Sequence, residues 1–332
     1  MSAPGHFVLS LDFELYWGVR DKRSIADYRE NLLGVRQVVP ALLQLFQRFS
    51  IHATWATVGL LFCSGRQDAL ASSPEQKPAY SASRFSPYAD SDTWGANESE
   101  DPFHFAPSLI DAVAATPYQE IATHTFSHFY CLEQGQDPQM FAADLAAAVA
   151  VAERRGLKLR SIVFPRNQVN PAYLPICAGA GLRSYRGTLE RGLYSPRNEE
   201  AQRPLVRAGR LLDNYLPLTR DRSTELADLG NRAPFNVAAS SFLRPHAKRL
   251  AVLEGRRQQR IAAELTRAAE LGRVYHLWWH PHNFGRNLSE NLSFLTRLLE
   301  HFSELRSRHG MQSVTMDELA GIRQEQLAEA AA

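Results

Sequence analysis

Short apolar runs alternate with longer amphipathic segments along most of the chain, and this alternation limits the possible folds more than any other feature. The short runs predict buried strands, and the longer segments, with apolar residues at helical spacing, predict helices. Repeated strand–helix units build a mainly parallel sheet. The predicted strands span residues 7–12, 51–61 (running into a short helix), 119–123, 161–164, 182–185, 235–243 and 274–279.

Helices are expected between these strands and after the last one. They span residues 28–49, 141–155, 171–181, 256–271, 292–302 and 316–330. Seven strands, each followed by a helix or a long connection, predict an α/β fold with a closed or nearly closed barrel. We expect a single domain over residues 1–332, ending in a C-terminal helix within 310–332, because α/β barrels of this length form one unit.

One long connection departs from the pattern. Residues 63–107 are rich in Ser, Pro, Asp and Gly and carry aromatic residues at intervals. Insertions of this length are usually functional or disordered. The aromatic residues favour an ordered lid or loop.

Charge and composition exclude several classes of protein. Lys and Arg number 37 against 35 Asp and Glu, a formal charge of +2, so there is no basic footprint for nucleic acid. No stretch approaches the ~20 apolar residues of a membrane span, and no export signal precedes the first strand. Cys63, Cys131 and Cys177 follow no disulfide or zinc pattern and are expected as buried thiols. These features predict a cytoplasmic protein.

Two acidic residues close the first predicted strand, in the segment SLDFE. Side chains two apart in a strand point to the same side, so Asp12 and Glu14 can act together on one site. Chemistry in α/β barrels gathers at the carboxyl ends of the strands, where the loops converge. The apolar neighbours Leu11, Phe13 and Leu15 favour a functional pair over two solvated acids.

Two histidines follow the third predicted strand, in the segment THTFSH. If the chain makes a helical turn there, His124 and His128 stand one above the other and can share one metal ion. With Glu14 they form a set of two histidines and one carboxylate, which leaves positions open for water and substrate. Such a set suits zinc or a comparable divalent ion.

The last predicted strand ends in HLWWHPHNF, which offers His276, His280 and His282. A hydrolase needs a general acid for the leaving group, and the pKa of histidine suits that task. His280 follows an apolar run and precedes Pro281, which ends the strand. His280 is therefore the candidate acid, and at least one of the other two histidines is expected to be a core or loop residue.

Two further charged residues are candidates with open roles. Arg166, after the fourth predicted strand, could hold a carboxylate in its ionised state or bind the substrate, and a plain surface role is equally compatible. Asp213 lies within an apolar run. It could pair with Arg166 or His280, or cap a turn through the Asp-Asn pair that it begins.

Together these residues resemble the motifs of the polysaccharide deacetylase family, also called carbohydrate esterase family 4, from about residue 7 to residue 280. SLDFE resembles a variant of the first motif, T-F-D-D-G, with one residue between the acids, and HTFSH matches H-[ST]-x-x-H in full. FPRNQ is similar to the arginine motif but lacks the Pro and the aromatic residue that follow the arginine. LWWH matches the final motif, L-x-x-H.

The resemblance implies a distorted (β/α)7 barrel that removes acetyl groups from N-acetylated sugars with a divalent metal ion, most often zinc. It also implies a role for each candidate. The implied catalytic residues are Asp12 (general base), His280 (general acid), Arg166 and Asp213, and the implied metal ligands are Glu14, His124 and His128.

The implied partner is an N-acetylated sugar or sugar conjugate. Trp17, Trp94, Trp278 and Trp279 favour a sugar ring, which stacks on such faces, with core packing as the alternative for each. A cytoplasmic location would point to a precursor in the assembly of a surface polysaccharide such as an O-antigen. Lys occurs four times, so 33 basic residues are arginine. Arginine suits an anionic conjugate, although a coding bias explains the excess equally well.

Three other interpretations remain open. The same barrel and metal could hydrolyse a non-sugar amide. Alternatively, Asp12 and Glu14 could be the acid and base of a glycosidase, which would work without a metal and resist chelators. A degenerate barrel could also bind a saccharide without turnover, but the two acids, the histidine pair and His280 together argue against it.

Overall fold

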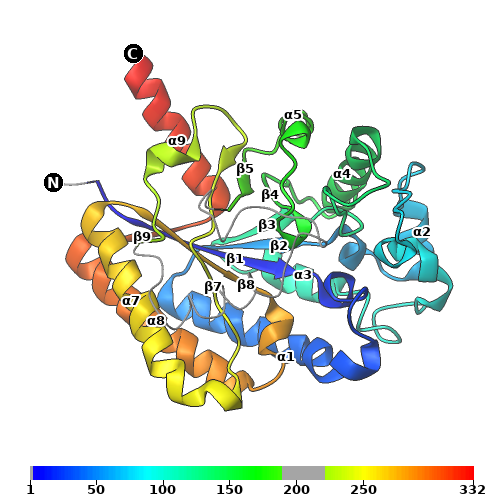
Figure 1. The fold of residues 1–332 in the computed structure, drawn as a ribbon, viewed down its shortest axis with the longest axis horizontal. Coiled ribbons are helices and arrows are strands. Elements are labelled where there is room, and N and C mark those ends of the chain that lie inside the picture. Colours follow the sequence, from blue (N-terminus) through cyan, green and yellow to red (C-terminus); the bar gives the residue numbers. More distant parts are fainter. Residues whose placement is uncertain (1–2, 189–220) are drawn as a thin grey trace.

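The computed structural model describes residues 3–188 and 221–332 and shows a parallel β-sheet curled into a barrel with helices around it (Figure 1). All pairings between the named strands are parallel. The strands are β1 (His6–Phe13), β2 (Ala53–Thr57), β3 (Gln119–Thr123), β4 (Ser161–Val163), β5 (Ser184–Arg186), β6 (Phe235–Asn236), β7 (Ser241–Phe242), β8 (Val274–Trp279) and β9 (Gln312–Val314).

An interrupted strand closes the barrel. From β1 the sheet continues through β2, β3, β4, β5 and β6 on one side and through β8 and β7 on the other. β6 and β7 belong to one segment, 235–243. Phe235 N donates to Arg183 O beside β5, and Leu243 N donates to Trp278 O of β8. The segment therefore bonds to β5 with its first half and to β8 with its second half, which completes a distorted ring of seven positions.

Helices cover the outside of the barrel, and α1, α8 and α7 pack side by side along one face (Figure 1). The N-terminus of α1 is capped by the Ser24 side chain, which accepts a hydrogen bond from Asp27 N, and its C-terminus ends at Ser50 in a left-handed conformation. The helices are α1 (Ile25–Phe49), α2 (Arg66–Ser72), α3 (Pro107–Ala114), α4 (Pro138–Glu153), α5 (Leu174–Gly179), α7 (Glu254–Leu271), α8 (Leu288–His309) and α9 (Met316–Ala331).

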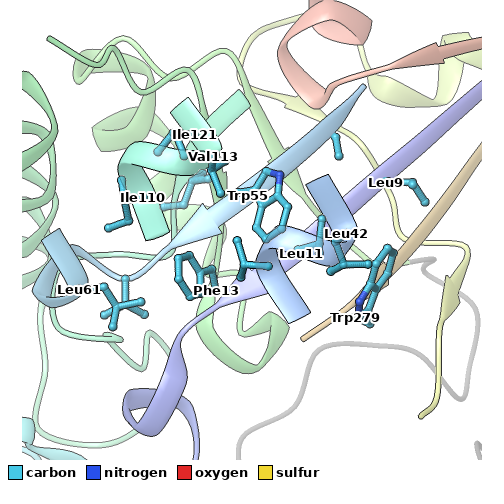
Figure 2. Packing of buried hydrophobic residues seen from close by; sticks show 14 of the residues in the cluster. Leu9, Leu11, Phe13, Leu42, Trp55, Leu61, Ile110, Val113, Ile121 and Trp279 are labelled. Atoms are coloured by element: carbon cyan, nitrogen blue, oxygen red, sulfur yellow. The ribbon is translucent and has the colours of Figure 1, made fainter. Parts of the chain in front are cut away.

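The two faces of β1 explain why the barrel has a polar interior. Every residue of β1 is buried. Leu9, Leu11 and Phe13 pack in the apolar layer between the barrel and its helices (Figure 2). Ser10 and Asp12 alternate with them and therefore point into the barrel. The carboxyl end of the central strand thus presents a carboxylate to the barrel axis.

The structure confirms the predicted α/β barrel, with differences in its short elements. The segment 51–61 divides into β2 and the 3-10 helix η2 (Gly59–Phe62). The insertion 63–107 contains α2 and the 3-10 helices η3 (Ser83–Phe85) and η4 (Pro87–Thr93). α3 and β9 were not predicted, because eight and three residues are too short to show a clear period.

Two composition-based expectations can be compared with the described residues. Cys63, Cys131 and Cys177 are buried and form no disulfide, as predicted. Among residues 3–188 and 221–332, no helix combines the length and apolarity needed to cross a membrane.

Candidate active site

Asp12 and Glu14 enter the site from consecutive elements. Asp12 lies in β1, and Glu14 precedes the 3-10 helix η1 (Leu15–Gly18). Both side chains are almost completely buried. Gly18 makes room for Glu14, because a Cβ on Gly18 would lie 1.9 Å from the Glu14 carboxyl carbon. The Glu14 side chain therefore packs back over η1 and faces the two histidines.

His124 and His128 lie on an irregular loop after β3. The expected helical turn is wrong: Thr125 and His128 have left-handed φ angles of 64° and 57°, and no helix forms at this point. The two rings nevertheless lie 5.1 Å apart, centre to centre. Reversals of the backbone thus bring the rings together where the sequence suggested a helix.

Asp144 of α4 anchors this loop from outside the site. Its carboxylate accepts hydrogen bonds from Phe126 N at 2.7 Å, from Ser127 N at 3.1 Å and from the Ser127 hydroxyl. Burial raises the pKa of Asp144 to about 6, although these hydrogen bonds act to lower it. Three donors on one buried carboxylate fix the backbone immediately before His128.

Glu14, His124 and His128 form a compact set of potential metal ligands. Their donor atoms lie within 4.8 Å of one another, and all three residues are buried. Nε2 of His124 lies 3.2 Å from Glu14 Oε2, and Nε2 of His128 lies 3.1 Å from the same oxygen. The structure thus brings together the three ligands that the sequence proposed.

The donor set fits a divalent cation. Nδ1 of His124 lies 2.7 Å from the carbonyl oxygen of Val163, so it must donate a proton there. In the neutral ring, Nε2 then carries a lone pair that faces the Glu14 carboxylate. Two lone pairs at this distance repel each other unless a proton or a cation lies between them. Two histidines and one carboxylate are a ligand set that zinc accepts, with further positions left for water and substrate.

Arg186 is the main partner of Asp12, and sequence reasoning missed it. Its Nη1 donates to Asp12 Oδ1 at 2.6 Å and its Nη2 to Asp12 Oδ2 at 2.7 Å. Nε and Nη2 also donate to the side-chain oxygen of Asn167, at 3.2 Å and 3.0 Å. Arg186 is completely buried at the end of β5. It stands one residue beyond the predicted strand 182–185, so the strand-end rule that identified Arg166 could have found it.

Burial and the surrounding charges shift the pKa values of Asp12 and Glu14 in opposite directions. Burial raises the pKa of Asp12, but the charge of Arg186, with those of His124 and His280, lowers it below the usual value. Burial also raises the pKa of Glu14, while the charge of His280 and the two loop histidines beside it hold that pKa well below its usual range. Both acids are therefore ionised at neutral pH.

His280 lies across the site from the loop histidines. Its Nε2 is 3.6 Å from Asp12 Oδ2 and 3.5 Å from Glu14 Oε1, and its side chain is 22% exposed, so it can reach both acids and a substrate. Nδ2 of Asn283 donates to Nδ1 of His280 at 3.2 Å. The ring proton of neutral His280 therefore lies on Nε2, facing the acids. His282 stacks on His280, and burial lowers the pKa of His282 to about 3.

The remaining two candidates are placed differently. Arg166 forms an ion pair with Asp21 rather than with Asp12, and its guanidinium lies 4.4 Å from the ring centre of Tyr130. Tyr130 in turn packs against His128, so Arg166 borders the site. Asp213 lies outside the described residues, and its pairing with Arg166 or His280 stays a prediction.

The tryptophans separate into core and site. Trp17, Trp94 and Trp279 belong to the hydrophobic core, which corrects the expectation that they favour a sugar ring. Trp278 is half-buried, and the Arg186 guanidinium lies 4.0 Å from the centre of its ring. Of the four tryptophans, Trp278 alone borders the site.

No family model and no curated protein sequence matches this chain. Several solved structures, in contrast, are similar to the structure of this chain. A polysaccharide deacetylase of Mycobacterium smegmatis has a TM-score of 0.61 at 15% identity, covering 98% of this chain and 94% of that one. A polysaccharide deacetylase of Pseudomonas aeruginosa PAO1 has a TM-score of 0.56 at 13% identity, covering 95% and 89%. An allantoinase has a TM-score of 0.53 at 14% identity, also covering 95% and 89%.

These similarities extend over nearly the full length of the chains compared, and they show that this protein shares its fold with polysaccharide deacetylases. Identities of 13–15% establish the fold alone. The activity must therefore be argued from the side chains of the site.

Proposed function

We propose that this protein is a metal-dependent deacetylase that hydrolyses the N-acetyl group of an amino sugar. The observation that carries the proposal is that side chains suited to three catalytic roles lie close together at the carboxyl end of β1. Glu14, His124 and His128 form a ligand set. Asp12 is an ionised acid held by an arginine, and His280 lies 3.6 Å from it with its ring proton facing inward.

Glu14, His124 and His128 would hold the metal ion, with zinc as the ion expected. When bound, a divalent ion polarises a carbonyl and lowers the pKa of a neighbouring water from 15.7 to about 7 in favourable sites. The buried carboxylate of Glu14 would balance part of the added charge. The loop anchored by Asp144 would keep the two imidazoles in place.

The protein's own residues move the protons. Asp12 accepts a proton as water attacks the acetyl carbon, and Arg186 keeps its carboxylate oriented. His280, when protonated to the imidazolium, would donate its Nε2 proton to the amide nitrogen, so that the C–N bond breaks and acetate and a free amine form. Asp12 Oδ2 and His280 Nε2 lie 3.6 Å apart, so the proton taken by Asp12 can return to His280.

The substrate class is proposed on less direct grounds. The solved structures that share this fold over nearly their full length include two polysaccharide deacetylases, and the half-buried Trp278 offers one aromatic face beside Arg186. We favour a cytoplasmic precursor of a surface polysaccharide of the O-antigen type, nucleotide-linked or lipid-linked. The 33 arginines would suit the phosphates of such a precursor.

Hydrolysis of a non-sugar amide is the second candidate. It is favoured by the allantoinase structure, which shares the fold over 95% of this chain. A glycosidase mechanism is disfavoured by the site itself: such enzymes need one protonated carboxyl group, and the pKa values of Asp12 and Glu14 are both lowered.

Hydrolysis of a substrate panel tests the proposal, measured as acetate release from the N-acetylated substrates and as ring opening of allantoin. The panel should contain nucleotide-linked N-acetyl sugars, N-acetylated polymers, and allantoin as the non-sugar amide. The proposal predicts that a chelator abolishes acetate release from an N-acetyl sugar and that zinc or cobalt restores it. Activity on allantoin alone would favour the second candidate, and hydrolysis that survives the chelator would contradict the metal-dependent mechanism. Activity confined to polymers would contradict the precursor assignment.

A further inference from the structure

A continuous row of buried hydrogen bonds extends from the barrel wall to Asp12. Nδ1 of His276 lies 3.0 Å from Val237 O, and Nε2 of His276 lies 2.8 Å from Ser10 Oγ. Nη1 of Arg186 lies 3.0 Å from the same Ser10 oxygen and also donates to Asp12. His276, Ser10 and Arg186 are all completely buried. None of the three belongs to the potential metal ligands.

The chemistry of the groups fixes the direction of every bond in this row. A carbonyl oxygen only accepts, so His276 must donate from Nδ1 to Val237 O. Burial and the charge of Arg186 lower the pKa of His276 to about 3, so the ring is neutral and Nε2 has no proton. The Ser10 hydroxyl must then donate to Nε2. Its oxygen is left as an acceptor for Arg186.

We propose that His276 and Ser10 are positioning residues that hold Arg186 in the one orientation that aligns Asp12 for catalysis. Asn167 binds the outer edge of the guanidinium, and Trp278 covers one of its faces. Ser10 supplies the contact deep in the barrel, so the guanidinium plane is held at both ends. The role given to Asp12 rests on the proposed function.

A neighbouring network provides a matched control. Ser184 precedes Arg186 by two residues on β5 and is completely buried. Its hydroxyl donates to Ser161 Oγ at 2.8 Å, and Ser161 donates to Glu120. This second network lies in the same barrel interior, and none of its hydrogen bonds among the described residues reaches Asp12 or Arg186. Removing a buried hydroxyl from either network leaves a void of the same size.

Steady-state kinetics of Ser10→Ala and Ser184→Ala test the proposal. We expect Ser10→Ala to lower kcat about 10- to 100-fold, in the range seen when a partner behind a catalytic group is removed, with KM within about twofold. Ser184→Ala should keep kcat within about twofold, and Ser10→Thr, which restores a hydroxyl, should recover part of the loss. Equal kcat for both alanine variants, or a loss confined to KM, would overturn the proposal.

Nitrogen-15 NMR of the side chains tests the hydrogen bonds from His276 through Ser10 to Arg186 without any substrate. Wild-type His276 should show the pattern of a neutral imidazole protonated on Nδ1. Ser10→Ala should shift the Arg186 Nε–H signal and speed its exchange with water, whereas Ser184→Ala should not. A His276 ring protonated on Nε2, or an Arg186 signal unaffected by Ser10→Ala, would overturn the proposal. Absence of hydrolysis by a wild-type protein with these signals would contradict the proposed function instead.

Discussion

Arg186 binds both carboxylate oxygens of Asp12, with nitrogen–oxygen distances of 2.6 Å and 2.7 Å, inside a barrel that excludes solvent from both residues. A planar guanidinium fixes the plane of the carboxylate as well as its charge. Lysine would supply the charge but only a single point of contact. The orientation of the base therefore depends on arginine at this position.

Arg186→Lys should lower kcat about 10- to 100-fold while the protein stays folded, because Asp12 remains ionised but loses its fixed orientation. Arg222 offers the matched control. It binds both oxygens of Glu264 in α7, at 2.9 Å and 2.8 Å, in another buried pair. Arg222→Lys should lower the melting temperature but leave kcat within about twofold. A similar loss of kcat in both variants would contradict a specific role for Arg186.

Asp144→Asn should weaken metal binding although residue 144 does not touch the site. An asparagine oxygen replaces only one of the two acceptors, so a donor of Ser127 loses its partner. An unsatisfied buried donor costs about 1–3 kcal/mol, and the loop before His128 should loosen. Zinc titration should show affinity reduced about 10- to 100-fold. Unchanged affinity in a destabilised variant would mean that Asp144 supports only the fold.

Gly18→Ala should displace Glu14 and impair metal binding, because the new Cβ would lie 1.9 Å from the Glu14 carboxyl carbon. Gly255 is the control: it lies in α7, and a Cβ there meets no atom within 4 Å among the described residues. Gly255→Ala should raise stability by about 0.5–1 kcal/mol. Metal content separates the two variants, and retention of a full metal complement in Gly18→Ala would refute the packing argument.

The buried His276 should make the protein sensitive to acid. Its pKa is about 3 in the folded protein, against 6.5 for the unperturbed group. Below pH 6.5 this histidine therefore binds a proton in the unfolded chain but stays unprotonated in the folded protein. The free energy of unfolding consequently falls as the pH falls towards 3. At 1.36 kcal/mol per pH unit, His276 should account for about 2 kcal/mol between pH 6.5 and 5.

Urea unfolding of His276→Gln at these two pH values measures that contribution. The variant should lose less stability than the wild type on acidification, by about 2 kcal/mol. His309→Gln, at the exposed end of α8, is the control and should follow the wild type. Identical pH dependence of the wild type and His276→Gln would contradict a neutral, buried His276.

The fold was predictable because its strands are buried on both faces. Each of the predicted strands is an apolar run in the sequence, whereas in the helices between them the apolar residues recur at helical spacing. The division of 235–243 between two neighbours was not predictable, since partner choice depends on barrel closure rather than on local sequence. β9 was missed because a strand of three residues gives no period.

The site was predictable where its residues stand directly at strand ends. Asp12, Glu14 and His280 could be found by that rule, and the structure places them together. The backbone reversals at Thr125 and His128 were not visible, because such residues seldom adopt positive φ angles. Arg186 was missed because the sequence shows an arginine after a weak strand but not the carboxylate to which the barrel brings it.

Metal content tests the account most directly. Elemental analysis of the wild type, of His124→Ala/His128→Ala and of the control His309→Ala should be combined with acetate release from N-acetyl sugars on the same samples. The account predicts about one divalent ion per chain in the wild type and the control, as expected for a single ligand set. It also predicts loss of both metal and acetate release in the double variant. A wild type that binds no ion after addition of zinc or cobalt would contradict it.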